Sequence, residues 1–204
     1  MSSLRHRHHQ DLAQQVLRTD ISGLPLEWID YRHAAKLHCL GQVSYSIGAE
    51  LYRIRGGMCA ATGQRSELTI NAIVATWGVN PELSGSQCQY RPPLTNQALF
   101  RRDACICLYC GKQFAPSDLS RDHVRPQVRG GKDVWVNVVT ACKRCNNFKA
   151  CRTPEEAGLE LLAIPFEPNH AEYVYLQGKR ILADQMEFLL AHFPHNSPLR
   201  QRLQ

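Results

Sequence analysis

Two cysteine pairs constrain the fold of this chain more than any other feature of its sequence. In each pair two residues separate the cysteines, and 31 residues lie between Cys110 of the first pair and Cys142 of the second. Such spacing lets four thiolates surround one zinc ion while the intervening chain closes a loop. We therefore expect a structural zinc site with the ligands Cys107, Cys110, Cys142 and Cys145. Because four protein ligands fill the tetrahedron of zinc, any chemistry has to come from other residues.

The cysteine count and the start of the sequence favour a reducing compartment. The chain has nine cysteines, an odd number, and its first residues, MSSLRHRHHQ, are polar and basic. Such a chain is poorly suited to a disulfide framework, and the sequence shows no secretory signal and no apolar run of membrane-spanning length. We expect a cytoplasmic protein with no membrane partner.

Positive charge is concentrated in the segment that carries the cysteine pairs. The 204-residue chain has 24 basic and 18 acidic side chains, which give a net charge of +6. Residues 101–152 alone hold 11 basic and 4 acidic side chains, a net charge of +7, whereas residues 153–204 hold 4 and 7, a net charge of −3. A local basic field beside a metal site favours a polyanionic partner, above all nucleic acid. A solvated basic face explains the charge alone equally well, so the motifs have to decide.

The rest of the sequence predicts an α+β protein in five parts. These are a flexible tail over 1–11, an N-terminal α+β region over 12–77, a linker over 78–98, a core over 99–157 and a C-terminal helical segment over 158–204.

Local patterns predict individual elements of these parts. Asp30 is expected to cap a helix over 31–40 that Gly41 ends, followed by strands over 43–47, 51–55 and 68–77. Thr95 is expected to cap a short helix. Thr153 is expected to start another helix through a capping box with Glu156. An amphipathic helix is expected over 181–193.

The segment between the cysteine pairs contains the residue types that catalysis needs. Asp122 precedes His123, two glycines stand at 130–131, and Asn137 follows. A carboxylate holds a hard divalent cation, and a neighbouring imidazole accepts a proton from water near neutral pH. The two glycines predict a hairpin turn between two strands, and a helix is expected from Asn137 to Lys149.

These motifs resemble those of HNH endonucleases of the ββα-metal, or His-Me finger, type. The resemblance covers roughly residues 99–157 and is carried by CLYCG at 107–111, RDHVRP at 121–126, GGKDVWVN at 130–137 and ACKRCNNFK at 141–149. It implies a zinc-stapled ββα-metal core between the N-terminal α+β region and the C-terminal helices. It also implies a metal-dependent endonuclease that hydrolyses phosphodiester bonds in nucleic acid, with double-stranded DNA favoured. The implied cofactors are structural Zn²⁺ and catalytic Mg²⁺ or Mn²⁺.

The resemblance assigns a role to each motif residue. Asp122 matches the acidic ligand of the catalytic cation, and His123 matches the general base that activates water. Asn137 matches the middle asparagine, which orders the hairpin and helps to orient the base. Asn146 stands where many relatives have histidine, as the second ligand, and its carbonyl oxygen suits Mg²⁺ or Mn²⁺. Phosphate contacts are expected from Arg101, Arg102, Arg121, Arg125, Lys143, Arg144 and Lys149.

Two other interpretations stay open at this point. One is a zinc-stabilised nucleic-acid-binding module without cleavage, and the other is a structural zinc protein with a protein partner. The joint presence of Asp122, His123 and Asn146 favours the nuclease, and the basic core argues against a protein partner. The sequence leaves open DNA or RNA, a nick or a double-strand cut, the target sequence and the biological role. A double-strand cut would favour a homodimer.

Overall fold

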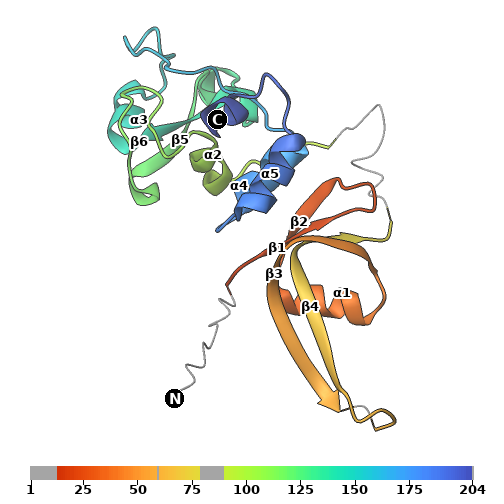
Figure 1. Ribbon diagram of the computed structural model, residues 1–204. Helices are drawn as coiled ribbons and strands as arrows, with labels where there is room; N and C mark the ends of the chain where they lie inside the picture. The colour runs from red at the N-terminus through yellow and green to blue at the C-terminus, as the bar shows by residue number, and fades with distance from the viewer. Residues whose placement is uncertain (1–12, 59, 79–89, 204) are drawn as a thin grey trace. The chain divides into compact units, whose positions relative to one another are not determined.

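The computed structural model describes residues 13–58, 60–78 and 90–203, which form two compact units (Figure 1). One unit contains the described residues up to 78 together with 177–194, and the other contains 90–176 together with 195–203. The expected tail over 1–11 and residues 79–89 of the expected linker lie outside the described residues. Helices and two sheets occur together, so the expected α+β class is confirmed.

The first unit is built on a four-stranded sheet with the order β2-β1-β4-β3. β1 (Val16–Thr19) pairs antiparallel with β2 (Pro25–Ile29) and parallel with β4 (Arg65–Thr76). β4 pairs antiparallel with β3 (Val43–Met58), and these two strands form the long ribbon seen in Figure 1. The core between the sheet and α1 (Tyr31–Cys39) consists of Val16, Ile29, Ala34, Leu37, Tyr52, Ile70 and Val74.

Two helix predictions in this unit are confirmed. Asp30 caps α1, since its Oδ1 atom accepts a hydrogen bond from the backbone N–H of His33 at 2.8 Å. α5 (Ala183–Ala191) lies inside the range expected for the amphipathic helix. Its Gln185 side chain is fully buried and donates to the carbonyl oxygen of Ala72 in β4 at 2.8 Å. Among the described residues, none of the helices is long and apolar enough to cross a membrane.

The two short strands expected over 43–47 and 51–55 are a single strand, β3. Its register with β4 shifts between Ile47 and Glu50, where Gly48 has a φ of +83°. A Cβ atom on Gly48 would lie 2.5 Å from Asp184 Oδ2, and the N–H of Ala49 donates to the same atom at 2.7 Å. The Asp184 carboxylate of α5 thus stabilises a bulge inside one strand. In the sequence pattern this bulge looks like a break between two short strands.

The second unit centres on two strands and a helix. β5 (Leu119–His123) pairs antiparallel with β6 (Val138–Cys142), and α3 (Lys143–Lys149) follows β6 directly. The prediction of a helix from residue 137 onward is wrong for 138–142, because all five residues are buried and form a strand. The helix begins only after Cys142, whose sulfur accepts from the N–H of Cys145 at 3.4 Å.

Other helices flank this ββα arrangement. α2 (Asn96–Arg102) is capped by Thr95 as expected, because Thr95 Oγ1 accepts from the N–H of Ala98 at 3.2 Å. A short 3-10 helix, η1 (Pro116–Asp118), leads into β5, and α6 (Pro198–Leu203) closes the described chain. α4 (His170–Gln177) belongs to this unit except for its last residue.

The connection between β5 and β6 is a long loop rather than a tight hairpin turn. It spans residues 124–137 and contains η2 (Gln127–Arg129) and η3 (Trp135–Asn137). Gly130 ends η2 with a φ of +80°, and a Cβ atom on Gly131 would lie 1.8 Å from the carbonyl oxygen of Arg125. The two flanking strands are present, but the two glycines shape the interior of a long loop, so the prediction of a hairpin turn at this pair is wrong.

The helix expected after Thr153 is reduced to a turn. Both bonds of the capping box are present, because Glu156 Oε2 accepts from the N–H of Thr153 at 3.0 Å and Thr153 Oγ1 accepts from the N–H of Glu156 at 3.4 Å. Gly158 follows with a φ of +65°. A capping box starts a helical turn, but a left-handed residue this close behind it ends the turn.

Candidate nuclease site

Four cysteines from three parts of the second unit converge. Cys107 and Cys110 precede β5, Cys142 ends β6, and Cys145 lies in α3. Their sulfur atoms all lie within 4.8 Å of one another. Zn–S bonds of about 2.3 Å in a tetrahedron place the sulfurs roughly 3.8 Å apart, so a small contraction would form such a centre. The prediction that these four side chains meet is confirmed.

Without a bound cation, the four cysteines cannot readily all be ionised at the same time. Burial raises the pKa of the Cys107 thiol, but backbone hydrogen bonds at Cys142, Cys110 and Tyr109 outweigh it, and the net pKa is lowered. Burial and the neighbouring Cys107 raise the pKa of Cys110, while burial and both Cys142 and Cys107 raise that of Cys145. Four thiolates this close require a cation to neutralise them, which is the chemistry of a metal centre.

β5 directs its last residues to two different faces. Side chains alternate along a strand, so Arg121 and His123 share one face and Asp122 takes the other. Asp122 is only 5% exposed, whereas the side chains of Arg121 and His123 are each 19% exposed. We call the side of Asp122 the inner face and the side of His123 the outer face.

A buried polar network occupies the inner face. The hydroxyl of Tyr109 donates to Asp122 Oδ2, and Lys149 Nζ donates to Asp122 Oδ1 at 3.1 Å and to the carbonyl oxygen of His123 at 2.7 Å. Burial, followed by the bond to the Asp122 carboxylate, raises the pKa of Tyr109, so the phenol remains a donor. The network ties α3 and the first cysteine pair to the backbone that carries His123.

A carboxylate that the sequence interpretation did not single out lies on the outer face. His123 Nε2 is 2.9 Å from Asp133 Oδ1 and 3.2 Å from Gln127 Nε2. Arg121 Nη1 donates to both oxygens of Asp133, at 2.9 and 2.7 Å. Partial burial raises the pKa of Asp133, but hydrogen bonds and charges from Arg121 and His123 outweigh it and lower the pKa overall. The only sequence signal was an acid inside the GGKDVWVN motif, and its contact with His123 depends on the path of the loop.

Asn137 holds the loop between β5 and β6 together. Its Oδ1 atom accepts from the N–H of Arg125 at 3.0 Å, and its Nδ2 atom donates to the carbonyl oxygens of Arg125 at 3.1 Å and Lys132 at 2.8 Å. Its own carbonyl oxygen accepts from the N–H of Val124 at 2.9 Å. These bonds connect the two sides of the loop next to Asp133.

Asn146 lies on α3 against β5. Its Nδ2 atom donates to Ser120 Oγ at 2.9 Å and lies 3.4 Å from the carbonyl oxygen of Arg121, which leaves its Oδ1 atom as an acceptor. Asp122 and Asn146 thus offer hard oxygen ligands from two adjacent elements. A carboxylate has about four lone-pair sites, so Asp122 retains capacity beside its bonds to Tyr109 and Lys149. The donor chemistry fits Mg²⁺ or Mn²⁺, which would have to reach a nearly buried carboxylate.

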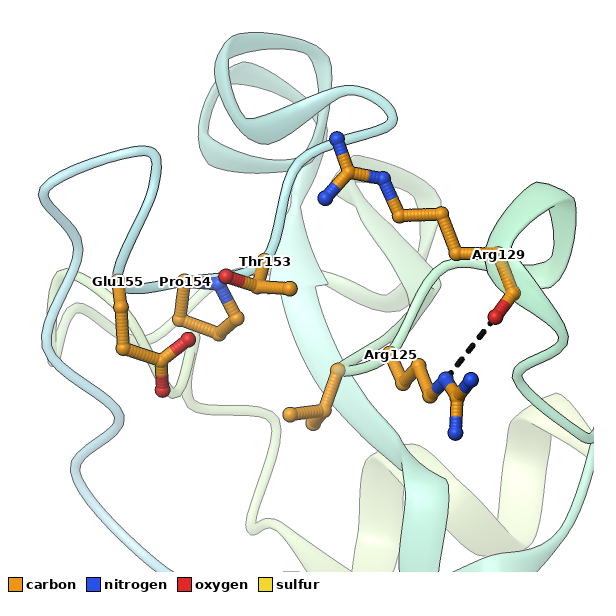
Figure 2. A pocket seen from close by; sticks show the side chains of 6 residues that line it. Arg125, Arg129, Thr153, Pro154 and Glu155 are labelled. Carbon is orange, nitrogen blue, oxygen red and sulfur yellow. Dashed lines mark hydrogen bonds between the residues drawn. The ribbon is translucent and has the colours of Figure 1, made fainter.

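A pocket opens beside the residue that follows His123. Its volume is about 370 Å³, and it is lined by Val124, Arg125, Arg129, Thr153, Pro154 and Glu155. Figure 2 shows Thr153, Pro154 and Glu155 on one side and the two arginines on the other. Arg125 Nε donates to the carbonyl oxygen of Arg129 at 3.0 Å, and Arg129 pairs with Glu156 at 2.6 Å. The pocket is thus lined by two exposed arginines of the loop that follows His123.

The basic residues expected to contact phosphate divide into exposed and internal groups. Lys143 and Arg144 are exposed and line a second pocket of about 860 Å³ beside the cysteine cluster. Arg102 and Lys149, by contrast, are fully buried. Arg102 is held by internal carbonyl oxygens, those of Trp135, Val138 and Phe166. Arg101 donates to the carbonyl oxygen of Leu176. Arg102 and Lys149 are thus bonded inside the second unit, and neither side chain is exposed in this structure.

The segment that carries this site resembles a known protein family. Residues 107–162 match the family model described as HNH endonuclease. The crystal structure of the Type II-C Cas9 enzyme from Actinomyces naeslundii matches with 21% sequence identity and a TM-score of 0.27, over 53% of this chain and 11% of that chain. No curated protein matches. The family match spans the cysteine cluster, β5, β6 and α3, and confirms the resemblance to HNH endonucleases over that segment.

Proposed function

We propose that the HNH endonuclease domain at residues 107–162 hydrolyses phosphodiester bonds in DNA in a metal-dependent reaction. One observation carries the proposal. β5 ends in Asp122 and His123, Asn146 of α3 contacts the same strand at Ser120 and Arg121, and the exposed Arg125 follows two residues after His123. Hydrolysis needs a base for the attacking water and positive charge for the phosphate, and this arrangement offers both.

In this proposal His123 takes the proton from the attacking water. Asp122 and Asn146 would hold a divalent cation, which would supply Lewis-acid stabilisation of the phosphate. Asn137 keeps the loop next to His123 in place through its bonds to Arg125 and Lys132. Arg125 contacts phosphate near the base, and the exposed Lys143 and Arg144 extend the basic surface along α3.

The role of zinc, the oligomeric state and the cellular location are part of the same proposal. Zn²⁺ in the four-cysteine cluster has a structural role, because four thiolates leave no open position for substrate. A nick needs a single copy of this small site, and a double-strand cut needs a homodimer. We propose the cytoplasm as the location, since reducing conditions keep the cysteines free to bind metal.

Cleavage of supercoiled plasmid tests the function directly. We expect the zinc-loaded protein to convert the plasmid to open-circular or linear form with Mg²⁺ or Mn²⁺ and not with EDTA. His123→Ala should reduce the rate by at least about 100-fold, because it removes the general base. His33→Ala, an exposed histidine in the first unit, is the matched control and should cleave at the wild-type rate.

Each result has a defined meaning. Equal zinc content and circular dichroism in wild type and His123→Ala would show that the loss is chemical. Wild-type cleavage by His123→Ala would contradict the mechanism. DNA that is bound but uncut with every metal would favour the nucleic-acid-binding module, and the same assay with RNA would follow.

A further inference from the structure

We propose that Asp133 is a positioning residue for His123, and that its carboxylate holds the imidazole in the tautomer with hydrogen on Nε2, so that Nδ1 receives the proton. The inference rests on the proposed function in one respect, the assignment of His123 as the base.

The contact between Asp133 and His123 determines which atom donates. Arg121 donates two hydrogen bonds to the Asp133 carboxylate, which favours its ionised form. An ionised carboxylate only accepts hydrogen bonds. His123 Nε2 lies 2.9 Å from Asp133 Oδ1, so this nitrogen carries the hydrogen. In a neutral imidazole the other nitrogen, Nδ1, then has the free lone pair.

Gln127 agrees with this tautomer once its amide is oriented. Its Nε2 atom lies 3.2 Å from His123 Nε2, and one ring nitrogen cannot donate to Asp133 and accept from Gln127 at the same time. The two ends of a glutamine amide are assigned from the hydrogen-bond network. With Asp133 ionised, Gln127 turns its Oε1 atom toward the ring.

Nδ1 of His123 is available to accept a proton. Within residues 90–203, no hydrogen bond to Nδ1 of His123 is found, and the side chain is 19% exposed. Nδ1 takes a proton from water, the oxygen of that water bonds to phosphorus, and the bond from phosphorus to the leaving oxygen breaks. The leaving oxygen takes a proton from solvent. The imidazolium formed at His123 is stabilised by the Asp133 carboxylate, which stays ionised.

The surrounding structure holds Asp133 in this position. Arg121 is itself anchored, because its Nε atom donates to Asn96 Oδ1 at 2.9 Å and its Nη2 atom to the carbonyl oxygen of Leu94 at 3.1 Å. On the other side, Asn137 Nδ2 donates to the carbonyl oxygen of Lys132, the residue before Asp133. The Arg121 guanidinium that binds the Asp133 carboxylate is therefore fixed in place, and so is the backbone that carries Asp133.

Nitrogen NMR of the full-length, zinc-loaded protein reads the tautomer directly. Long-range ¹H–¹⁵N correlations at a pH where His123 is neutral should show a single tautomer in the wild type, with hydrogen on Nε2. In Asp133→Ala we expect a measurable population with hydrogen on Nδ1, because Gln127 can then donate to Nε2. A wild-type ring protonated on Nδ1, or an unchanged single tautomer in Asp133→Ala, would overturn the proposal.

Cleavage kinetics distinguish a role of Asp133 in orienting His123 from a role in stabilising the loop alone. We expect Asp133→Ala to lower kcat by about 10- to 100-fold with little change in KM, a smaller loss than for a buried triad carboxylate because Asp133 is 45% exposed. Asp133→Glu should restore part of kcat. Glu160→Ala, which changes an exposed acid away from both pockets, is the control and should leave kcat unchanged. Loss of thermal stability with an unchanged tautomer and kcat would mean that Asp133 only fastens the loop.

The two proposals fail in distinguishable ways. If the wild type does not cleave, the proposed function fails. The NMR measurement then still decides whether Asp133 sets the tautomer of His123. If the wild type cleaves but the tautomer does not depend on Asp133, only the positioning role is lost.

Discussion

At the scale of single residues, burial changes the meaning of several motif side chains. Lys149 lies in a basic segment, yet it is fully buried and pairs with the nearly buried Asp122. A buried ammonium is tolerated only with compensating partners, and here a carboxylate and the His123 carbonyl oxygen supply them. Lys149 therefore ties α3 to the strand that carries His123 and adds nothing to the basic surface.

We predict that Lys149→Met destabilises the protein substantially. The change leaves the Asp122 carboxylate buried without its cation, and breaking a buried pair in this way costs about 3–5 kcal/mol. The free energy of unfolding from urea denaturation of the second unit measures the effect. Lys143→Met, an exposed lysine on the same helix, should change this value by less than about 0.5 kcal/mol. Equal stabilities of the two variants would refute the prediction.

At the scale of elements, the loop over 124–137 connects the strands and also places Asp133 beside His123. Its shape depends on a close backbone approach, because a Cβ atom on Gly131 would lie 1.8 Å from the Arg125 carbonyl oxygen and 3.0 Å from Asn137 Nδ2. The glycine pair by itself predicts a hairpin turn. The two 3-10 turns of the loop are not predictable from the sequence, because short turns of this kind leave little periodic signal.

We predict that Gly131→Ala distorts this loop and impairs cleavage. The added methyl group has to displace backbone or break the bond between Asn137 and Arg125, at a cost of about 1–3 kcal/mol. Thermal unfolding and plasmid cleavage should both report the change. Gly57→Ala in β3 is the matched control, since a Cβ atom there meets nothing within 4 Å and no positive φ is involved. Full cleavage activity in Gly131→Ala would show that the loop tolerates the shift.

At the scale of the whole molecule, the described chain forms two compact units with separate hydrophobic clusters. The cluster around Val16 and Tyr52 belongs to the first unit, and the cluster around Cys107 and Val139 belongs to the second. Cys107 and Cys142 belong to the second cluster and Cys145 packs against it, so we expect metal to stabilise that unit in particular.

We predict that Cys142→Ser releases the structural metal and destabilises only the second unit. Mass spectrometry under native conditions should show loss of one zinc ion. Amide hydrogen exchange should accelerate in β5 and β6 while β4 keeps its protection, because loss of a metal site unfolds the region that depends on it. Cys39→Ser, an exposed cysteine in the first unit, should change neither value. A full zinc content in Cys142→Ser would contradict the four-ligand site.

The features determined by sequence alone are those with local causes. Spacing identified the cysteine cluster, caps at Asp30 and Thr95 marked the starts of two helices, and the motif order identified the HNH segment. Each of these depends on residues a few positions apart, or on ligand types that a metal selects.

Tertiary structure alone decided the features that join distant segments. The parallel pairing of β1 with β4 and the strand character of the buried VVTAC run could not be anticipated, because an apolar run that is buried all round has no distinguishing period. The burial of Lys149 and the placement of Asp133 against His123 likewise follow from packing and from the path of a loop. Charge and motif position specify the chemical type of a side chain, whereas its partners depend on which surfaces the fold brings together.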